Sequence, residues 1–157
     1  MIDFLIYGLV IYSFNSFVVL FHELGHAIFA LLFTKEKVTI SIGKDSRKKI
    51  TINIKRLTIH FTVFTFWHGY VIFGQIEGKS KKILTYLGGV LNNILLIIIG
   101  TIILKFVNLE PVIILIRCLI YASLWSLIVC MIPFKCRYYY PKEFNSDMKN
   151  IIYIIKE

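Results

Sequence analysis

Three long runs of apolar residues dominate the pattern of this chain. They extend over residues 4–33, 83–106 and 112–132. Each run is long enough for the roughly 20 helical residues that cross a hydrocarbon core about 30 Å thick. Helices that are apolar on every side lie in a bilayer or inside a protein core. The pattern therefore predicts a membrane α-helical fold with a core of three transmembrane helices.

The segment between the first two runs has the pattern of β-strands instead. Its stretches are rich in β-branched residues, and apolar positions alternate over part of their length. The expected strands cover residues 38–42, 50–54, 57–66 and 70–76. Turn signals at 43–46 and at Lys55-Arg56 separate the first three of them. We predict a small, membrane-associated β-sheet within residues 38–76.

The third run ends at Pro133, where a proline stops or kinks a helix because it lacks an N–H donor. Ser146 and Asp147 then precede an apolar stretch that ends at Ile155. A serine or aspartate in that place is a helix-start signal. We expect residues 146–157 to return toward the first helix, and the whole chain, residues 1–157, to form a single domain.

Composition and charge support the membrane assignment and predict the orientation of the chain across the membrane. Hydrophobic residues make up 57% of the 157 residues, and the net charge is +9. Residues 34–82 carry 11 lysines and arginines against 3 acidic residues, and residues 133–157 carry 5 against 3. Because basic loops stay in the cytoplasm, we expect the N-terminus outside and both the sheet and the C-terminus inside.

This charge pattern also bears on the partners of the protein. The basic residues avoid the apolar runs and lie between them, so the net charge does not indicate nucleic acid as a partner. We expect a multi-pass protein of the cytoplasmic membrane, with the lipid bilayer as its partner. The cysteines, Cys118, Cys130 and Cys136, are odd in number and lack CxxC spacing. They are predicted to be small, buried apolar residues.

An HExxH motif, residues 22–26, lies near the end of the first run. On a helix, His22 and His26 lie one turn apart on one face, so both imidazoles can bind a single Zn²⁺ with Glu23 beside them. Ionisable groups inside a bilayer are costly, so three of them within five residues indicate a function. The structural alternative is that they make polar contacts between packed helices.

A catalytic zinc site usually has three protein ligands, so a third must come from elsewhere in the chain. Asp147 is preferred because it follows the third run and begins a segment that can fold back; it could also be a simple helix cap. The other candidates are Glu143, His60, His68 and Glu77.

The second run contains paired glycines, Gly88 and Gly89, followed by Asn92 and Asn93. Small residues let two helices approach closely, and amides inside a bilayer need partners. Asn93 lies about 16 Å of helical rise above Lys82, and His26 lies about 10 Å before the end of the first run. Antiparallel neighbours would therefore place an amide near the metal. Asn93 could bond the substrate or the developing oxyanion, or simply pack between helices.

Together these motifs resemble the site-2 protease family of intramembrane zinc metalloproteases. The similarity covers nearly the whole chain: His22-Glu23-Leu24-Gly25-His26, then Gly69-Tyr70-Val71 in the β-region, Gly89-Val90-Leu91-Asn92-Asn93, and Ile132-Pro133 followed by Ser146-Asp147. Three positions depart from the family pattern. Val90 replaces a proline, Cys130 stands where the family has an asparagine, and Met148 follows Asp147 in place of a glycine.

The resemblance implies zinc-dependent hydrolysis of a peptide bond in or near the inner leaflet. His22, His26 and Asp147 would hold the ion, Glu23 would be the general base, and Asn93 would assist. Gly69, Tyr70 and Val71 would hold a membrane-spanning or membrane-associated peptide in an extended form. The substrate could be a membrane-tethered regulator or a peptide precursor.

Two other functional hypotheses for the same residues stay open. One is a membrane metalloprotease of another lineage, with Glu143 as the third ligand. The other is a non-proteolytic membrane protein that uses the histidine pair for metal binding, metal transport or helix packing.

Overall fold

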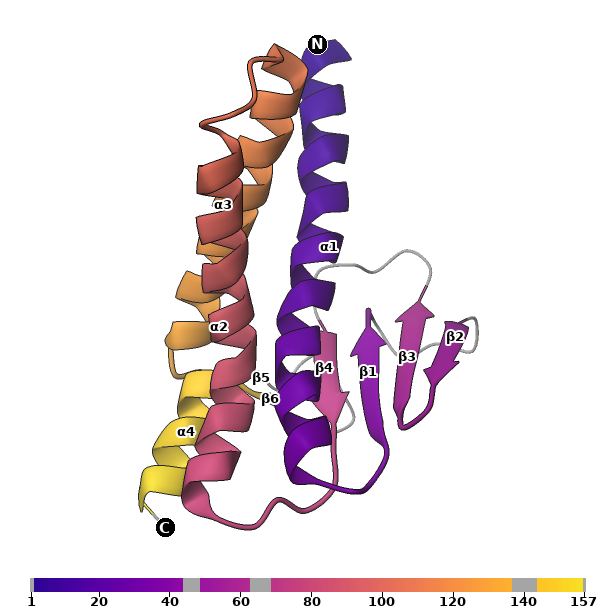
Figure 1. Cartoon of the computed structure of the whole chain (residues 1–157), viewed down its shortest axis with the longest axis vertical. Coiled ribbons are helices and arrows are strands. Elements are labelled where there is room, and N and C mark those ends of the chain that lie inside the picture. The colour runs from indigo at the N-terminus through magenta and orange to yellow at the C-terminus, as the bar shows by residue number, and fades with distance from the viewer. Residues whose placement is uncertain (1, 44–48, 63–68, 137–143, 157) are drawn as a thin grey trace.

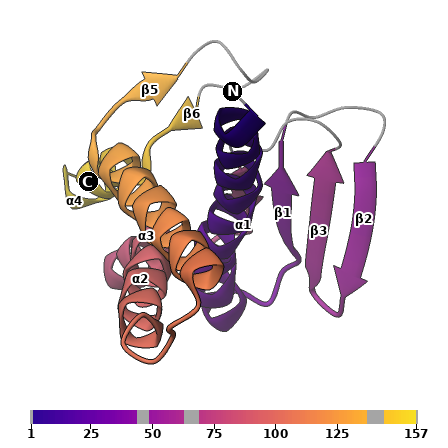
Figure 2. The ribbon, with the colours of Figure 1, turned by 90° about the horizontal axis from the view of Figure 1, so that it is seen from above.

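The structure is a computed structural model, which describes residues 2–43, 49–62, 69–136 and 144–156. Its elements in chain order are α1 (Ile2–Phe33), β1 (Val38–Ile42), β2 (Lys49–Ile54), β3 (Leu57–Thr62), β4 (Gly69–Ile72), α2 (Lys79–Ile103), α3 (Glu110–Met131), β5 (Lys135–Cys136), β6 (Phe144–Asn145) and α4 (Asp147–Lys156). The three long helices stand side by side, and the sheet flanks one half of α1 (Figure 1). Seen from above, α1 lies between the sheet and the other helices (Figure 2).

Three helical segments are long and apolar enough to cross a membrane: residues 14–33 of α1, the whole of α2 and the whole of α3. The sequence prediction of three long apolar helices is therefore confirmed, with small differences at the ends. α2 begins at Lys79, because Gly78 with φ 90° turns the chain into the helix. α3 begins at Glu110, where an acidic residue and Pro111 suit the first turn of a helix.

α1 and α2 touch through their backbones at one pair of glycines. A Cβ at Gly25 would collide with the carbonyl oxygen of Gly88, and a Cβ at Gly88 would collide with that of Gly25. Next to this crossing, Asn92 Nδ2 donates to the Phe21 carbonyl oxygen over 2.8 Å. The close approach expected from the paired glycines is thus present, and it brings the backbone of α2 against the histidine face of α1.

The sheet has the strand order β2-β3-β1-β4. β2 and β3 form a hairpin through Lys55 and Arg56, and Lys55 has the positive φ of 52° that such a tight turn requires. β1 pairs with β3 in parallel and with β4 in antiparallel orientation. β4 ends at Ile72, earlier than the predicted 76, while residues 63–66 of the third predicted strand lie outside the described part of the chain.

The inner face of the sheet packs on α1 and forms the core. Val38, Ile40 and Ile42 of β1 are buried together with Ala27 and Ala30 of the helix. Small alanines on the helix let the β-branched side chains of the strand approach its backbone. The sheet is thus fixed to the half of α1 that carries the HExxH motif.

Arg56 attaches the sheet to α1 at a second place, the C-terminal end of the helix. Its guanidinium donates to the Thr34 carbonyl oxygen over 2.7 Å and to the Leu31 carbonyl oxygen over 3.0 Å. The last carbonyls of a helix have no partner within the helix, so this arginine caps α1 from the β2–β3 turn. The cation also suits the negative end of the helix dipole.

The C-terminal helix begins where the sequence predicts. Ser146 Oγ accepts from the Lys149 amide over 3.4 Å and from the Phe134 amide over 3.1 Å. This serine therefore caps α4 and also ties it to the end of α3. α4 packs on α2 and α3, and its first residue, Asp147, contacts His22 of α1.

Candidate metal centre

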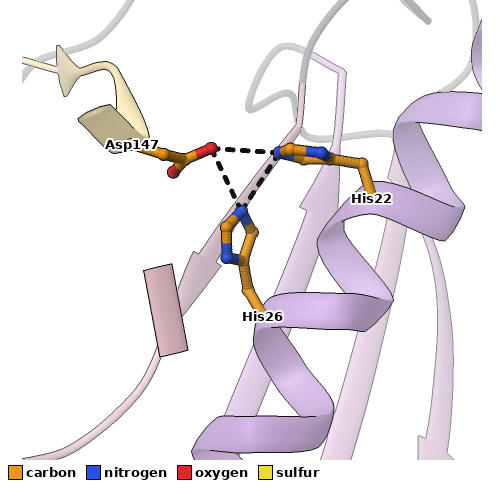
Figure 3. A group of neighbouring side chains, drawn as sticks. All are labelled: His22, His26 and Asp147. Carbon is orange, nitrogen blue, oxygen red and sulfur yellow. Dashed lines mark hydrogen bonds and ion pairs between the residues drawn. The ribbon is translucent and has the colours of Figure 1, made fainter. Parts of the chain in front are cut away.

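Three side chains from the two ends of the chain meet beside α2 (Figure 3). His22 and His26 project from one face of α1, and Asp147 is the first residue of α4. His22 Nε2 lies 3.1 Å from His26 Nε2 and 3.1 Å from Asp147 Oδ2. His26 Nε2 lies 3.3 Å from the same carboxylate oxygen. These three atoms form a group that could hold a metal ion.

The spacing suits a small tetrahedral ion. Ligand atoms at about 2.0–2.1 Å from such an ion lie about 3.3–3.4 Å from one another, which follows from the tetrahedral angle. The observed separations of 3.1 to 3.3 Å are close to this value. Two nitrogens and one carboxylate oxygen leave the fourth corner open.

The hydrogen bond of His26 indicates how its ring is protonated. His26 Nδ1 lies 2.8 Å from the Thr85 carbonyl oxygen, which can only accept, so Nδ1 carries the proton. In the neutral ring, Nε2 then presents a lone pair to the carboxylate of Asp147. The two lone pairs repel unless a proton on Nε2 or a metal cation lies between them. The arrangement is therefore compatible with a bound cation.

Asn93 lies on the other side of His22 and is fully buried. Its Nδ2 is 3.1 Å from His22 Nδ1 and 3.0 Å from Ser126 Oγ, while its Oδ1 has no partner among the described residues. The two ends of an amide are assigned from their partners. Turned by half a rotation, Asn93 accepts from both His22 Nδ1–H and the Ser126 hydroxyl. His22 Nε2 is then free to bind an ion.

These contacts show Asn93 at the depth expected from the sequence, and they connect it to His22. The described contacts of its side chain are with His22 and Ser126. Its suggested role toward a substrate stays a prediction.

Glu23 lies between the two histidines in sequence and is only 7% exposed. Gly69, the first residue of β4, packs directly on it: a Cβ there would lie 2.7 Å from Glu23 Cγ. Tyr70 and Val71 continue along β4, where they pair with Ser41 and Ile40 of β1. The structure thus places Gly69 beside Glu23 at the start of the edge strand.

Gly89 forms the wall of the site on the α2 side. A Cβ at this position would lie 2.5 Å from His22 Nε2 and 2.5 Å from His26 Nε2. Only glycine leaves room for both ring nitrogens. The second glycine of the pair therefore makes space for the candidate ligands, while Gly88 makes space for the helix crossing.

Asp147 is largely buried, and its pKa reflects its neighbours. Burial alone would raise the pKa of this carboxyl. The charge on His26 and the hydrogen bonds from His22 and His26 outweigh burial, so the pKa of Asp147 is held well below its usual range. Asp147 is therefore an anion at neutral pH, as a ligand for a cation must be.

Cys130 corrects the sequence-based prediction of a small, buried apolar residue. Its side chain is half-buried, and its Sγ lies 3.5 Å from His22 Nε2. The thiol therefore borders the candidate metal centre. The sequence contained one indication of this position. Cys130 stands at a motif position where the family that the chain resembles has an asparagine.

The other proposed third ligands divide into two groups. His60 lies on β3, where its ring contacts Thr51 Oγ1 over 2.9 Å, and Glu77 is exposed in the connection before α2. The structure does not bring either to the two histidines. His68 and Glu143 lie outside the described residues.

Sequence reasoning missed the contributions of Thr85 and Ser126. Thr85 acts through its carbonyl oxygen, which every residue has, so no side-chain pattern could reveal it. Ser126 is one of two serines in α3 and carries no motif.

No protein-family model matches this chain, and comparison with curated proteins gives no match either. The functional argument therefore depends on the residues of the site and on their surroundings.

Proposed function

We propose that this protein is a zinc-dependent endopeptidase that cleaves a membrane-associated peptide in or near the cytoplasmic leaflet, as the resemblance to site-2 proteases implies. One observation carries the proposal. His22 Nε2, His26 Nε2 and Asp147 Oδ2 lie at tetrahedral spacing beside the glutamate of an HExxH helix. This glutamate position is that of the general base in metalloproteases with the motif.

Zinc is the metal that fits this donor set best. Two imidazoles and a carboxylate around an open fourth position are typical of catalytic zinc sites. The second contacts, from the Thr85 carbonyl and the Asn93 amide, are of the kind that orient zinc-binding histidines. A zinc ion held there would act as a Lewis acid that polarises a scissile carbonyl and lowers the pKa of water.

Glu23 is the proposed general base. It stands on the same helix turn as His22, and its burial excludes bulk water from the carboxylate. In the reaction, Glu23 accepts a proton from the attacking water and donates it to the amine that leaves. Its contact with Gly69 supports a proton transfer near the edge of the sheet.

A location in the membrane is supported by the surface of the helices. Large apolar side chains such as Ile98 of α2 and Ile128 of α3 are about half exposed, which suits contact with lipid. Most of the basic residues that the structure describes lie within 34–82 and 133–157, which include the sheet and α4 at the same end of the bundle. We therefore propose that this end faces the cytoplasm, with the N-terminus outside.

The edge strand β4 is the proposed support for the substrate. A transmembrane helix cannot be cleaved while its amides are paired within the helix, so the cleaved segment must be extended. β4 is the outermost strand of the described sheet and pairs only through β1. An extended peptide added to its other edge would pass Gly69 and come close to Glu23.

Zinc content and cleavage, measured together on purified protein, test the proposal. Synthetic peptides with about 20 apolar residues and short polar flanks, reconstituted in vesicles, serve as substrates. We expect the wild type to hold about one zinc ion per chain and to cleave some of these peptides. Glu23→Gln should keep the zinc and lose cleavage by at least about 100-fold.

Glu110→Gln is the matched control, since Glu110 is exposed in the first turn of α3 at the opposite end of the bundle. It should behave as the wild type. Zinc binding without any cleavage by the wild type would instead favour a non-proteolytic metal-binding protein.

A further inference from the structure

A cavity of about 620 Å³ opens at the end of the bundle, away from the candidate metal ligands. Three segments form its walls: the connection 73–78 from β4 to α2, the first turns of α2, and α4. These segments meet at the lower end of the molecule in Figure 1. Its volume is within the range of about 300–1,000 Å³ that is typical of ligand sites.

Each wall of this cavity continues from a part of the candidate metal centre. The connection follows β4, which begins at Gly69 against Glu23. Tyr86 follows Thr85, whose carbonyl oxygen bonds His26. Asn150 lies one turn of α4 after Asp147. A peptide extended along β4, from Glu23 toward Ile72, therefore has this cavity directly ahead of it.

The lining combines aromatic faces with a few polar groups. Phe73 and Tyr86 meet edge to face with ring centroids 6.0 Å apart, and Tyr153 forms part of the α4 wall at 52% exposure. Gln75 and Asn150 add amides that can bond a peptide backbone. Such a surface accepts a bulky apolar side chain and fixes the chain on either side of it.

Both signs of charge lie around the cavity, with lysines more numerous. Lys82 lines it, Lys79 follows Gly78 of the lining in sequence, and Lys149 lies with its Nζ 5.9 Å from the centre of the Tyr153 ring. Glu77 also lines it, and a Cβ at Gly74 of the lining would collide with the Glu36 carboxylate. Acidic residues beside the bulky side chain of a ligand would complement these lysines.

We propose that this cavity binds the cytoplasmic flank of the peptide substrate and selects an aromatic or large aliphatic residue with acidic neighbours. The inference rests on the proposed endopeptidase function, which supplies the peptide and its direction along β4. The cavity then determines which membrane peptides are held long enough to be cleaved. It also fixes how far the cleaved bond lies from this anchor residue.

Binding without cleavage provides the first test. The probe is the N-acetylated, C-amidated peptide Asp-Phe-Asp with a photoreactive diazirine on the phenylalanine ring, added to zinc-loaded Glu23→Gln protein. We expect crosslinks to the aromatic lining, at Phe73, Tyr86 or Tyr153. The peptide Asp-Ala-Asp should bind at least about tenfold more weakly, because the cavity then stays partly empty.

Two variants and one matched control locate the site. Tyr153→Ala should weaken binding of the phenylalanine peptide about tenfold by removing one wall. Gln75→Trp should weaken it similarly by filling the cavity, and it retains the fold because Gln75 is exposed. Ile155→Ala, on the same helix but 64% exposed and outside the lining, should change nothing. Crosslinks elsewhere, or equal binding by Tyr153→Ala and Ile155→Ala, would overturn the assignment.

A second measurement separates this inference from the proposed function. Vesicle peptides with and without the Asp-Phe-Asp flank are compared as substrates of the wild type. We expect the flank to lower KM about tenfold with kcat within about twofold, and Tyr153→Ala to abolish that difference. Cleavage that ignores the flank overturns the cavity assignment but leaves the endopeptidase intact. Crosslinking in the cavity without cleavage of any peptide overturns the endopeptidase instead.

Discussion

Asn93 of α2 and His22 of α1 meet amide against imidazole, with Asn93 Nδ2 3.1 Å from His22 Nδ1. An ion at His22 Nε2 requires a proton on Nδ1, which the amide oxygen of Asn93 can accept once the amide is turned. Asn93→Ala should therefore weaken zinc binding about 10–100-fold, the usual effect of removing such an orienting contact. Competition with a chromophoric chelator measures this.

The neighbouring amide provides the control for this prediction. Asn92 bonds the Phe21 carbonyl and makes no described contact with the histidines. Asn92→Ala should loosen the packing of α1 and α2 but keep zinc affinity within about threefold, well short of the effect expected for an orienting contact. Asn93→Asp retains an acceptor oxygen and should bind zinc better than Asn93→Ala. Equal affinities for the alanine variants at 92 and 93 would contradict the orienting role.

Asp147 should be the third zinc ligand. Asp147→Ala removes the carboxylate that completes the three-atom group with the histidine pair, so zinc should fall well below one ion per chain. Metal analysis after gel filtration measures it. Glu143→Ala should keep its zinc. If Asp147→Ala keeps its zinc and Glu143→Ala loses it, Glu143 is the ligand and the protein belongs to a different kind of metalloprotease.

Gly89→Ala should lose the bound zinc while retaining the fold. The added methyl group would lie 2.5 Å from the nitrogen atoms of both histidines, and the α2 backbone cannot withdraw because it is packed at Gly88. Overpacking of this kind typically costs about 1–3 kcal/mol. Gly100→Ala is the comparison, since its nearest contacts would be side-chain carbons away from the site, Ile120 Cγ1 at 2.9 Å and Ile116 Cγ2 at 3.5 Å. Zinc content and thermal unfolding should separate the two variants.

Cys130 should make the centre sensitive to thiol reagents. Its Sγ is 3.5 Å from His22 Nε2, so a group attached to this sulfur would occupy the space of the ion. Treatment of the zinc-free protein with methyl methanethiosulfonate should prevent zinc rebinding. The Cys130→Ala variant, which retains Cys118, should rebind zinc after the same treatment. Loss of rebinding in both proteins would place the sensitive thiol elsewhere.

The parts of the fold that the sequence could predict are those set by local patterns. Apolar runs define the three long helices, alternation defines the strands, and Ser146 marks the start of α4. The histidine pair follows from helical spacing alone. The similar depth of Asn93 and the histidines in the bundle could also be predicted, because the rise per residue sets the position of each residue along two antiparallel helices.

What the sequence could not predict depends on contacts between distant segments. β1 and β3 pair in parallel although β2 lies between them in the chain, and both contribute side chains to the core, whereas β2 is exposed throughout. Arg56 looks like a turn residue, and its role as a cap for α1 requires the sheet to be in place. Likewise, Cys130 becomes part of the centre only when α3 is packed next to His22.

The separation of His22 and Asp147 by 125 positions has a consequence for biosynthesis. Both histidines leave the ribosome early, but the carboxylate follows the last of the three long helices. During synthesis the histidines therefore lack this carboxylate. Under the proposed function, the growing chain could not cut itself or its neighbours, and hydrolytic capacity would arise only after the third long helix has been made and packed.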